Sequence, residues 1–240
     1  MSDHISRKEL KQDKVRETFE HGAEAVLSHT TMMSVALLAI VVIAAGYFGW
    51  RYYSHRQENQ AQVAFDEALR TFVAPISQPG QPIPPGELSY ADPAKRAEDA
   101  EAKFAAVASK FPRTKAGKLA FYYSGLCLMD TDKLNQATEQ LKKLAATGDK
   151  ELSALAKFQL AIIAERNGKK DEAISELKAL STSGSILLPK PMVLLELAGI
   201  LSQSDPKQAT TLYQQLKKDY PNTPVADQAD RGLQLLAATT

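Results

Sequence analysis

The sequence predicts an all-α protein in which a single N-terminal transmembrane helix precedes a stack of paired helices, an α-solenoid. Three observations support this fold class. Residues 30–50 carry no charged side chain. Downstream, alanines followed by hydrophobic residues four and seven positions later recur at successive separations of 37, 36 and 36 residues. A proline-rich stretch over residues 75–86 separates these two parts of the chain.

The uncharged run from Thr30 to Trp50 is long enough to cross a membrane. A helix rises about 1.5 Å per residue, so the run covers roughly 30 Å, the thickness of a hydrocarbon core. It is apolar all round, unlike a core helix with one polar face. Aromatic rings, which favour the headgroup layer, crowd its C-terminal end; they are Tyr47, Phe48, Trp50, Tyr52 and Tyr53. The sequence therefore predicts a membrane span over residues 30–53.

The length of the run also predicts that the span is an uncleaved anchor, because a signal peptide has an apolar stretch of only about 7–15 residues. Basic residues favour the cytoplasmic side of a span. Arg51 and Arg56 follow the run, whereas five basic residues precede it: Arg7, Lys8, Lys11, Lys14 and Arg16. Residues 1–29 are thus predicted to be a cytoplasmic tail, either a short amphipathic helix or a solvated segment.

Composition excludes several classes of function. The formal net charge is +1, without the basic excess that nucleic-acid binding requires. The four histidines lie at residues 4, 21, 29 and 55, and we find no metal-binding, phosphate-binding or nucleophile motif. Cys127 lies between Leu126 and Leu128, so we expect a buried, inert thiol. We therefore predict no catalytic residue, cofactor or metal site.

Residues 54–240 are predicted to form one helical domain interrupted by a proline-rich insert at residues 75–93. Hydrophobic residues at helical spacing from Arg56 to about Val73 predict a helix that ends before Pro75. Five prolines and two glycines within residues 75–86 predict an extended loop. This insert either joins two helices or is itself recognised as a polyproline-type segment.

The repeated sets organise the rest of the chain. Each has an alanine with large apolar residues at +4 and +7, and the alanines are Ala100, Ala137, Ala173 and Ala209. Gly125 and Ala161 lie twelve residues before the second and third alanines. Small residues at these positions allow two antiparallel helices to cross closely. Gly168 suits the turn within the third pair, and Val225–Ala238 is predicted to cap the stack.

This pattern resembles the tetratricopeptide repeat over about residues 60–235. The resemblance implies about four helix pairs that bind other proteins. The fourth unit departs from the pattern, because Ala198 lies only eleven residues before Ala209 and the connection at residues 204–206 is short.

We predict that first-helix residues one turn from the packing positions form a protein-binding groove on the inner face. Tyr122 and Phe158 are expected to be exposed there. Alternatively, these residues are core, covered by the Val63–Phe72 helix or by the capping helix. The predicted binding residues are Leu119, Tyr122, Leu126, Met129, Leu155, Phe158, Ile162 and Leu194.

The end of the span, together with the repeats, resembles the single-pass ancillary subunit family of the bacterial Sec translocon. The residues that carry this resemblance are Gly46, Gly49, Trp50, Arg51 and Tyr52. The resemblance implies a non-enzymatic, chaperone-like scaffold in the inner membrane with a periplasmic domain. Its implied partners are translocon subunits, periplasmic chaperones and exported polypeptides, with residues 30–53 in contact with lipid. An envelope scaffold for division or outer-membrane assembly is the alternative.

Overall fold

The computed structural model describes residues 30–77 and 88–239. The chain divides between Arg56 and Gln57 into two compact units. Helix α2, Thr30–Phe72, runs through this boundary without a break. Two sequence interpretations concern residues outside the described ranges: the form of the tail at residues 1–29 and that of the insert at residues 78–87.

The first unit contains the apolar part of α2. This part is long and apolar enough to cross a membrane, although a signal sequence near an N-terminus would meet the same criterion. None of its most apolar stretch is buried, and Ile43, Phe48 and Trp50 are each more than 60% exposed. Side chains of this kind favour an apolar environment, and the other described residues do not supply one.

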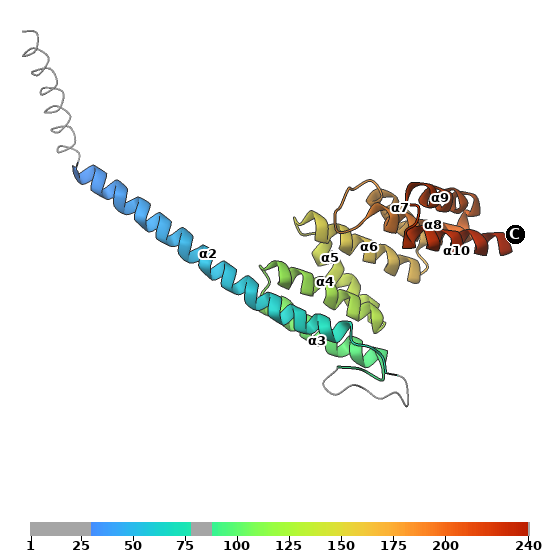
Figure 1. Ribbon diagram of the computed structural model, residues 1–240, viewed down its shortest axis with the longest axis horizontal. Helices are drawn as coiled ribbons and strands as arrows, with labels where there is room; N and C mark the ends of the chain where they lie inside the picture. Colours follow the sequence, from blue (N-terminus) through green and yellow to red (C-terminus); the bar gives the residue numbers. More distant parts are fainter. Residues whose placement is uncertain (1–29, 78–87, 240) are drawn as a thin grey trace, which may run out of the picture. The chain divides into compact units, whose positions relative to one another are not determined.

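The second unit is a stack of antiparallel helices (Figure 1). After the C-terminal part of α2 come α3 (Pro93–Lys110), α4 (Lys115–Asp130), α5 (Leu134–Ala145) and α6 (Lys150–Arg166). They are followed by α7 (Lys170–Leu180), α8 (Lys190–Ser204), α9 (Pro206–Asp219) and α10 (Pro224–Thr239). Contacts join α4 with α5, α6 with α7, α8 with α9, and α10 with both α8 and α9. The C-terminal part of α2 packs on α3 through Phe65 and Phe104. This arrangement confirms the predicted all-α solenoid and its capping helix.

Side-chain caps explain where several helices begin. Asp92, Asp149 and Asp205 accept hydrogen bonds from backbone N–H groups in the first turns of α3, α6 and α9, and Thr114 does so for α4. Such caps satisfy N–H groups that have no partner within the helix. Asp205 also ends α8, which accounts for the short connection that the sequence predicted in the fourth pair.

The turns within the second and third pairs share one backbone conformation. Asp132 has φ 58° and Gly168 has φ 76°, and both lie five residues before the alanine of their pair. Glycine adopts this left-handed conformation at no steric cost, and aspartate tolerates it better than most residues. The predicted turn at Gly168 is confirmed.

Small residues lie where the paired helices cross, as predicted. Ala100, Ala137, Ala173 and Ala209 are all 0% exposed. A Cβ atom on Gly125 would lie 3.2 Å from Cδ2 of Leu141, so α4 and α5 leave little room for a side chain at this position. The same spacing of small residues thus repeats the same close packing along the stack.

The insert is closed at its base by paired backbone segments. Ile76 and Tyr90 form an isolated parallel bridge, in which Ser77 N–H donates to Tyr90 O at 2.8 Å and Tyr90 N–H donates to Pro75 O at 3.0 Å. The Tyr90 hydroxyl donates to Asp99 of α3 at 3.2 Å. These contacts hold both ends of the insert against the repeat domain.

Candidate protein-binding face

The first helices of the second, third and fourth pairs form a row. Helix α4 contacts α6, and side chains of α6 and α8 belong to one core cluster. We call the exposed side of α4, α6 and α8 the inner face. Apolar residues of this face are half-buried, neither fully covered nor fully solvated; they are Leu119, Leu126, Leu155 and Ile162. A row of this kind offers apolar surface to an added chain without a large exposed patch.

Four of the predicted residues are buried. Tyr122 and Phe158 are only 7% exposed, so the expectation that they are exposed is wrong, and Met129 and Leu194 are each 6% exposed. Gln159 of α6 donates a hydrogen bond to the Tyr122 hydroxyl at 3.0 Å, which ties that ring to the next pair. Phe158 and Leu194 belong to one core cluster that extends into α8 and α9. Contacts between neighbouring pairs therefore cover the residues that a single pair would expose.

Charged residues join the row near the C-terminal ends of α4 and α6, where sequence reasoning looked only for apolar ones. Burial raises the pKa of Asp130, while the charges of Arg96 and Arg166 oppose this effect. Burial also raises the pKa of Glu196, the charge of Glu165 adds to the rise, and Arg166 opposes it. Arg166 thus acts on carboxylates from two other helices. The sequence contains one sign of this position of Arg166: it follows Ile162 by one helical turn, which is the spacing of residues on one helix face.

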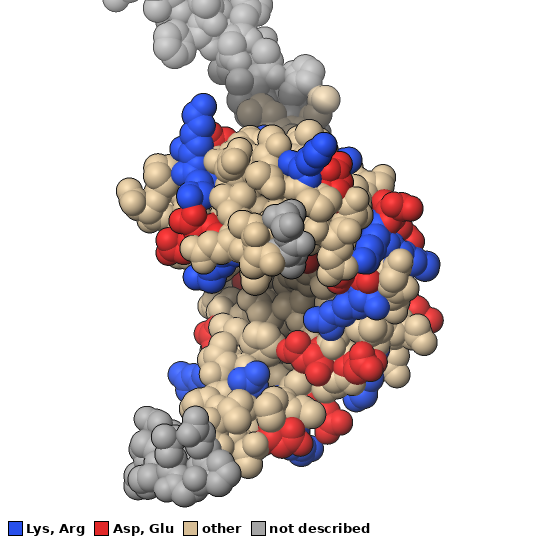
Figure 2. All heavy atoms as spheres, turned by 90° about the vertical axis from the view of Figure 1, so that its right-hand side faces the viewer, with Lys and Arg blue, Asp and Glu red and all other residues tan. Residues whose placement is uncertain are grey.

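The surface of the repeat domain is hollowed. Figure 2 shows this hollow below the C-terminal helices, with mostly uncharged atoms at its centre and charged side chains beside it. Apolar segments of other polypeptides bind in grooves of this general character.

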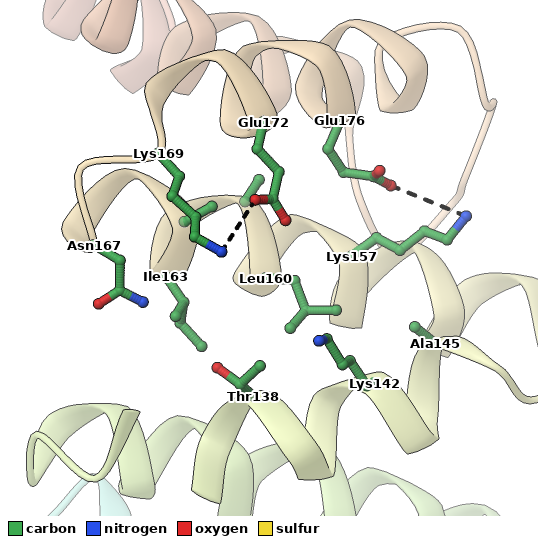
Figure 3. Close-up of a pocket in the computed structure, with 12 residues that line it drawn as sticks. Thr138, Lys142, Ala145, Lys157, Leu160, Ile163, Asn167, Lys169, Glu172 and Glu176 are labelled. Atoms are coloured by element: carbon green, nitrogen blue, oxygen red, sulfur yellow. Dashed lines mark ion pairs between the residues drawn. The ribbon is translucent and has the colours of Figure 1, made fainter. Parts of the chain in front are cut away.

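A second concavity lies between α5, α6 and α7 (Figure 3). It has a volume of about 260 Å³, and Leu160 and Ile163 form part of its floor. Two ion pairs border it, Lys157–Glu176 at 4.0 Å and Lys169–Glu172 at 3.5 Å. Exposed pairs of this kind contribute little to stability. We call this concavity the outer groove and use it below as a reference surface.

Cys127 is buried in the core formed by α2, α3 and α4. Burial, with smaller effects of Asp130 and Glu101, raises the pKa of its thiol from 9.0 to about 12. The thiolate is the reactive form, so a thiol with this pKa stays protonated and inert at neutral and mildly alkaline pH.

We therefore expect the native protein to resist a maleimide reagent at pH 8 and at pH 9, a range in which an ordinary thiol becomes about half ionised. Denaturant should restore labelling of the same cysteine. Stoichiometric labelling of the native protein, followed by mass spectrometry, would contradict the buried position of Cys127.

Among residues 30–77 and 88–239, no group of three or more histidine, cysteine, aspartate or glutamate side chains is placed to hold a metal ion. The inner face instead combines half-buried apolar side chains with a charged end. These are the features of a surface that binds polypeptides.

Comparisons with known proteins identify the class of this helical repeat. The tetratricopeptide repeat-like domain family matches residues 28–184, and a tetratricopeptide repeat model matches residues 192–223. The chain belongs to the tetratricopeptide repeat-like domain family. The first match includes the apolar part of α2 as well as the first three helix pairs.

A solved structure supports the same fold. The chain is similar to the crystal structure of TPR-like repeats described as a kinesin light chain from Podospora anserina. That likeness has a TM-score of 0.50 and 13% sequence identity, and it covers 75% of this chain and 93% of the other. The chain has no match among curated proteins. Tetratricopeptide repeat domains bind other proteins and are generally non-enzymatic scaffolds.

Proposed function

We propose that this protein is a membrane-anchored scaffold that binds other polypeptides on the inner face of its repeats. The half-buried apolar row on α4 and α6 is the observation that carries this proposal. These side chains lose solvent on binding without any rearrangement of the core. Burial of apolar surface is the main driving force of such association.

Anchoring follows from the apolar part of α2. We assign residues 1–29 to a cytoplasmic tail, residues 30–53 to the membrane span, and residues 54–240 to a repeat domain that carries the 75–93 insert. The basic residues before the span favour a cytoplasmic N-terminus, which places the repeat domain in the periplasm of a bacterium. The unburied apolar side chains of the span are then in contact with lipid.

The charged end of the inner face favours one kind of bound segment. Burial raises the pKa of Glu196, the nearby charge of Glu165 adds to the rise, and Arg166 opposes it. A positively charged side chain of a bound polypeptide would relieve this repulsion. An apolar segment that carries a basic residue therefore fits the face better than an acidic segment.

The resemblance at Gly46, Gly49 and Trp50 supports the proposal that this scaffold acts at the Sec translocon. There it would act as a chaperone-like ancillary subunit that contacts translocon subunits, periplasmic chaperones and newly exported polypeptides. An envelope scaffold for division or outer-membrane assembly would use the same face for different partners. The identity of the complex that is bound separates these two functions.

The test is photo-crosslinking in intact membranes, with a photoreactive amino acid in place of Leu126 or Ile162. We expect crosslinks to translocon subunits or to exported chains. Leu160 is a matched control, because it is another half-buried residue of α6 but lines the outer groove. We expect little crosslinking from that position.

Three outcomes would contradict parts of the proposal. Equal crosslinking from Leu160 and Ile162 would remove the special role of the inner face. Crosslinks only to division or outer-membrane assembly proteins would favour the alternative scaffold and exclude the translocon. Recovery of the protein in the soluble fraction would contradict the membrane anchor.

A further inference from the structure

The connection between α7 and α8, residues 181–189, exposes two large apolar side chains. Ile186 is 86% exposed and Leu187 is 50% exposed. We call this connection the 181–189 loop. Of the large apolar side chains reported as exposed within the repeat domain, Ile186 has the highest exposed fraction. Two helices of this stack can be joined by fewer residues, because the α4–α5 and α6–α7 turns are much shorter than the 181–189 loop. The length of chain needed to join α7 and α8 therefore does not explain why Ile186 is exposed.

The loop is held in place by one carboxylate. Oε2 of Glu151, in the first turn of α6, accepts hydrogen bonds from the Ser185 hydroxyl at 2.6 Å and from the N–H groups of Ile186 at 2.7 Å and Leu187 at 2.9 Å. These bonds keep the pKa of Glu151 below its usual value. The carboxylate thus stays charged, and charge-assisted bonds are the stronger kind.

A second contact, made by Leu188, fixes the loop to the core of the repeat domain. Leu188 is only 4% exposed and packs in the core cluster shared by α6 to α9. Its N–H donates to the Ser185 hydroxyl at 3.1 Å, so Ser185 links Glu151 to Leu188. Leu188 is buried, and the backbone N–H groups of Ile186, Leu187 and Leu188 are hydrogen-bonded. Because these contacts fix the backbone, the side chain of Ile186 cannot turn into the core. The loop is therefore built to display Ile186.

Two lysines, Lys150 and Lys190, flank this loop. The Lys150 ammonium donates to Gly184 O at 3.3 Å, and Lys190 begins α8 at the other end of the loop. Lys190 also lines a cavity of about 290 Å³, together with loop residues that include Ser181, Thr182 and Ser185. The Lys190 ammonium beside this cavity can attract the phosphate of a lipid headgroup. The carboxylate of Glu151, next to Lys150 in sequence, already accepts hydrogen bonds from three donors.

We propose that the 181–189 loop is a membrane-contact site, which inserts Ile186 and Leu187 into the headgroup layer of an anionic bilayer. Apolar tips flanked by lysines bind such surfaces through apolar burial and attraction to anionic lipid. Two side chains on a narrow loop provide little area for a stable protein interface, which normally buries about 800 Å² on each partner. The inference rests on the proposed anchoring of α2, because that anchor brings the lipid surface to the repeat domain.

The test places an environment-sensitive fluorophore on the full-length protein through Ile186→Cys. Cys127 does not compete for the label, because its thiol is buried and has a pKa of about 12. We expect the emission to shift to the blue and to rise about twofold or more when the protein moves from detergent into vesicles containing phosphatidylglycerol, as for a group that enters the apolar boundary. Vesicles of phosphatidylcholine alone should give a smaller change.

The matched control is Leu235→Cys, at a leucine of α10 that is 70% exposed. Its label should not respond to the vesicles. Lys190→Glu, added to Ile186→Cys, should reduce the response in anionic vesicles, whereas Lys207→Glu on α9 should leave it unchanged. Flotation of each sample shows whether the span is in the bilayer.

Flotation separates the two proposals. Protein that floats with the vesicles but shows the same emission at positions 186 and 235 would overturn the loop insertion and leave the anchor intact. Protein that does not float would overturn both. Quenching of the 186 label only by an added repeat-binding polypeptide, with no response to lipid, would instead assign the loop to a protein partner.

Discussion

Replacing Phe104 with alanine is expected to destabilise the repeat domain by about 3–5 kcal/mol, the range found for buried aromatic residues. Phe104 is 0% exposed and is the largest of the fully buried side chains. Its ring lies 5.5 Å from Phe65, 6.1 Å from Phe72 and 5.2 Å from Tyr123, measured between centroids. These rings come from α2 and α4, so one side chain of α3 joins three helices.

The effect should be large because the site cannot collapse easily. Aromatic pairs at these separations add stability beyond their buried area. Removing the Phe104 ring leaves three rings, held by two other helices, around a cavity. Since Phe65 and Phe72 belong to α2, the substitution also loosens the attachment of α2 to the rest of the stack.

Urea unfolding of the full-length protein in detergent, followed by circular dichroism, measures this loss. Val73→Ala is the control, because Val73 is 64% exposed and lies just after α2. We expect that change to remain within about 0.5 kcal/mol, as for other surface substitutions. A loss below about 1 kcal/mol for Phe104→Ala would mean that the aromatic cluster does not hold α2, α3 and α4 together.

The repeats could be predicted from the sequence because each depends on local spacing. An alanine with large residues at +4 and +7 places one small and two large side chains on the same helix face. The starts of several helices also depend on local sequence, since Thr114, Asp149 and Asp205 cap the helices that follow them. These features need no knowledge of how one pair meets the next.

The exposure of the inner face could not be predicted in the same way, because it depends on how neighbouring pairs are packed. The hydrogen bond between Gln159 and Tyr122 spans 37 residues of sequence. Leu194 is buried because it packs in the core cluster that α8 shares with α6, α7 and α9. That Leu126 and Ile162 are half-buried can be seen only from the packed arrangement of the first helices.

The 181–189 loop is a second feature whose exposure the sequence does not predict. Serine, threonine and glycine in residues 181–185 are typical of an irregular connection. The sequence does not indicate that Glu151, more than 30 residues earlier, binds this loop and directs Ile186 outward. A carboxylate in the first turn of a helix is common. Only the three-dimensional structure shows that the carboxylate of Glu151 binds the 181–189 loop.

Gly117→Ala and Gly199→Ala are expected to change stability in opposite directions, although both replace a helical glycine with alanine. A Cβ atom on Gly117 would lie 2.7 Å from the carbonyl carbon of Phe111, and closer still to its oxygen. A Cβ atom on Gly199 in α8 meets nothing within 4 Å. The first substitution forces backbone atoms apart, whereas the second only restricts the unfolded chain and improves helix propensity.

The cost at Gly117 includes more than a steric overlap. The Phe111 carbonyl accepts hydrogen bonds from Thr114 N–H at 3.1 Å and from the Thr114 hydroxyl at 2.8 Å. Thr114 in turn accepts from Gly117 N–H at 2.9 Å, which caps α4. Moving the carbonyl therefore disturbs the connection between α3 and α4 together with the start of α4.

We expect Gly117→Ala to lower the free energy of unfolding by about 2–3 kcal/mol. Gly199→Ala should raise it by about 0.5–1 kcal/mol, provided that the helix accepts the methyl group without strain. Chemical denaturation of both variants beside the wild-type protein gives the sign of each change. Because helix propensity alone would make both substitutions favourable, a stabilised Gly117→Ala variant would show that the α3–α4 connection is not packed as tightly as its contacts indicate.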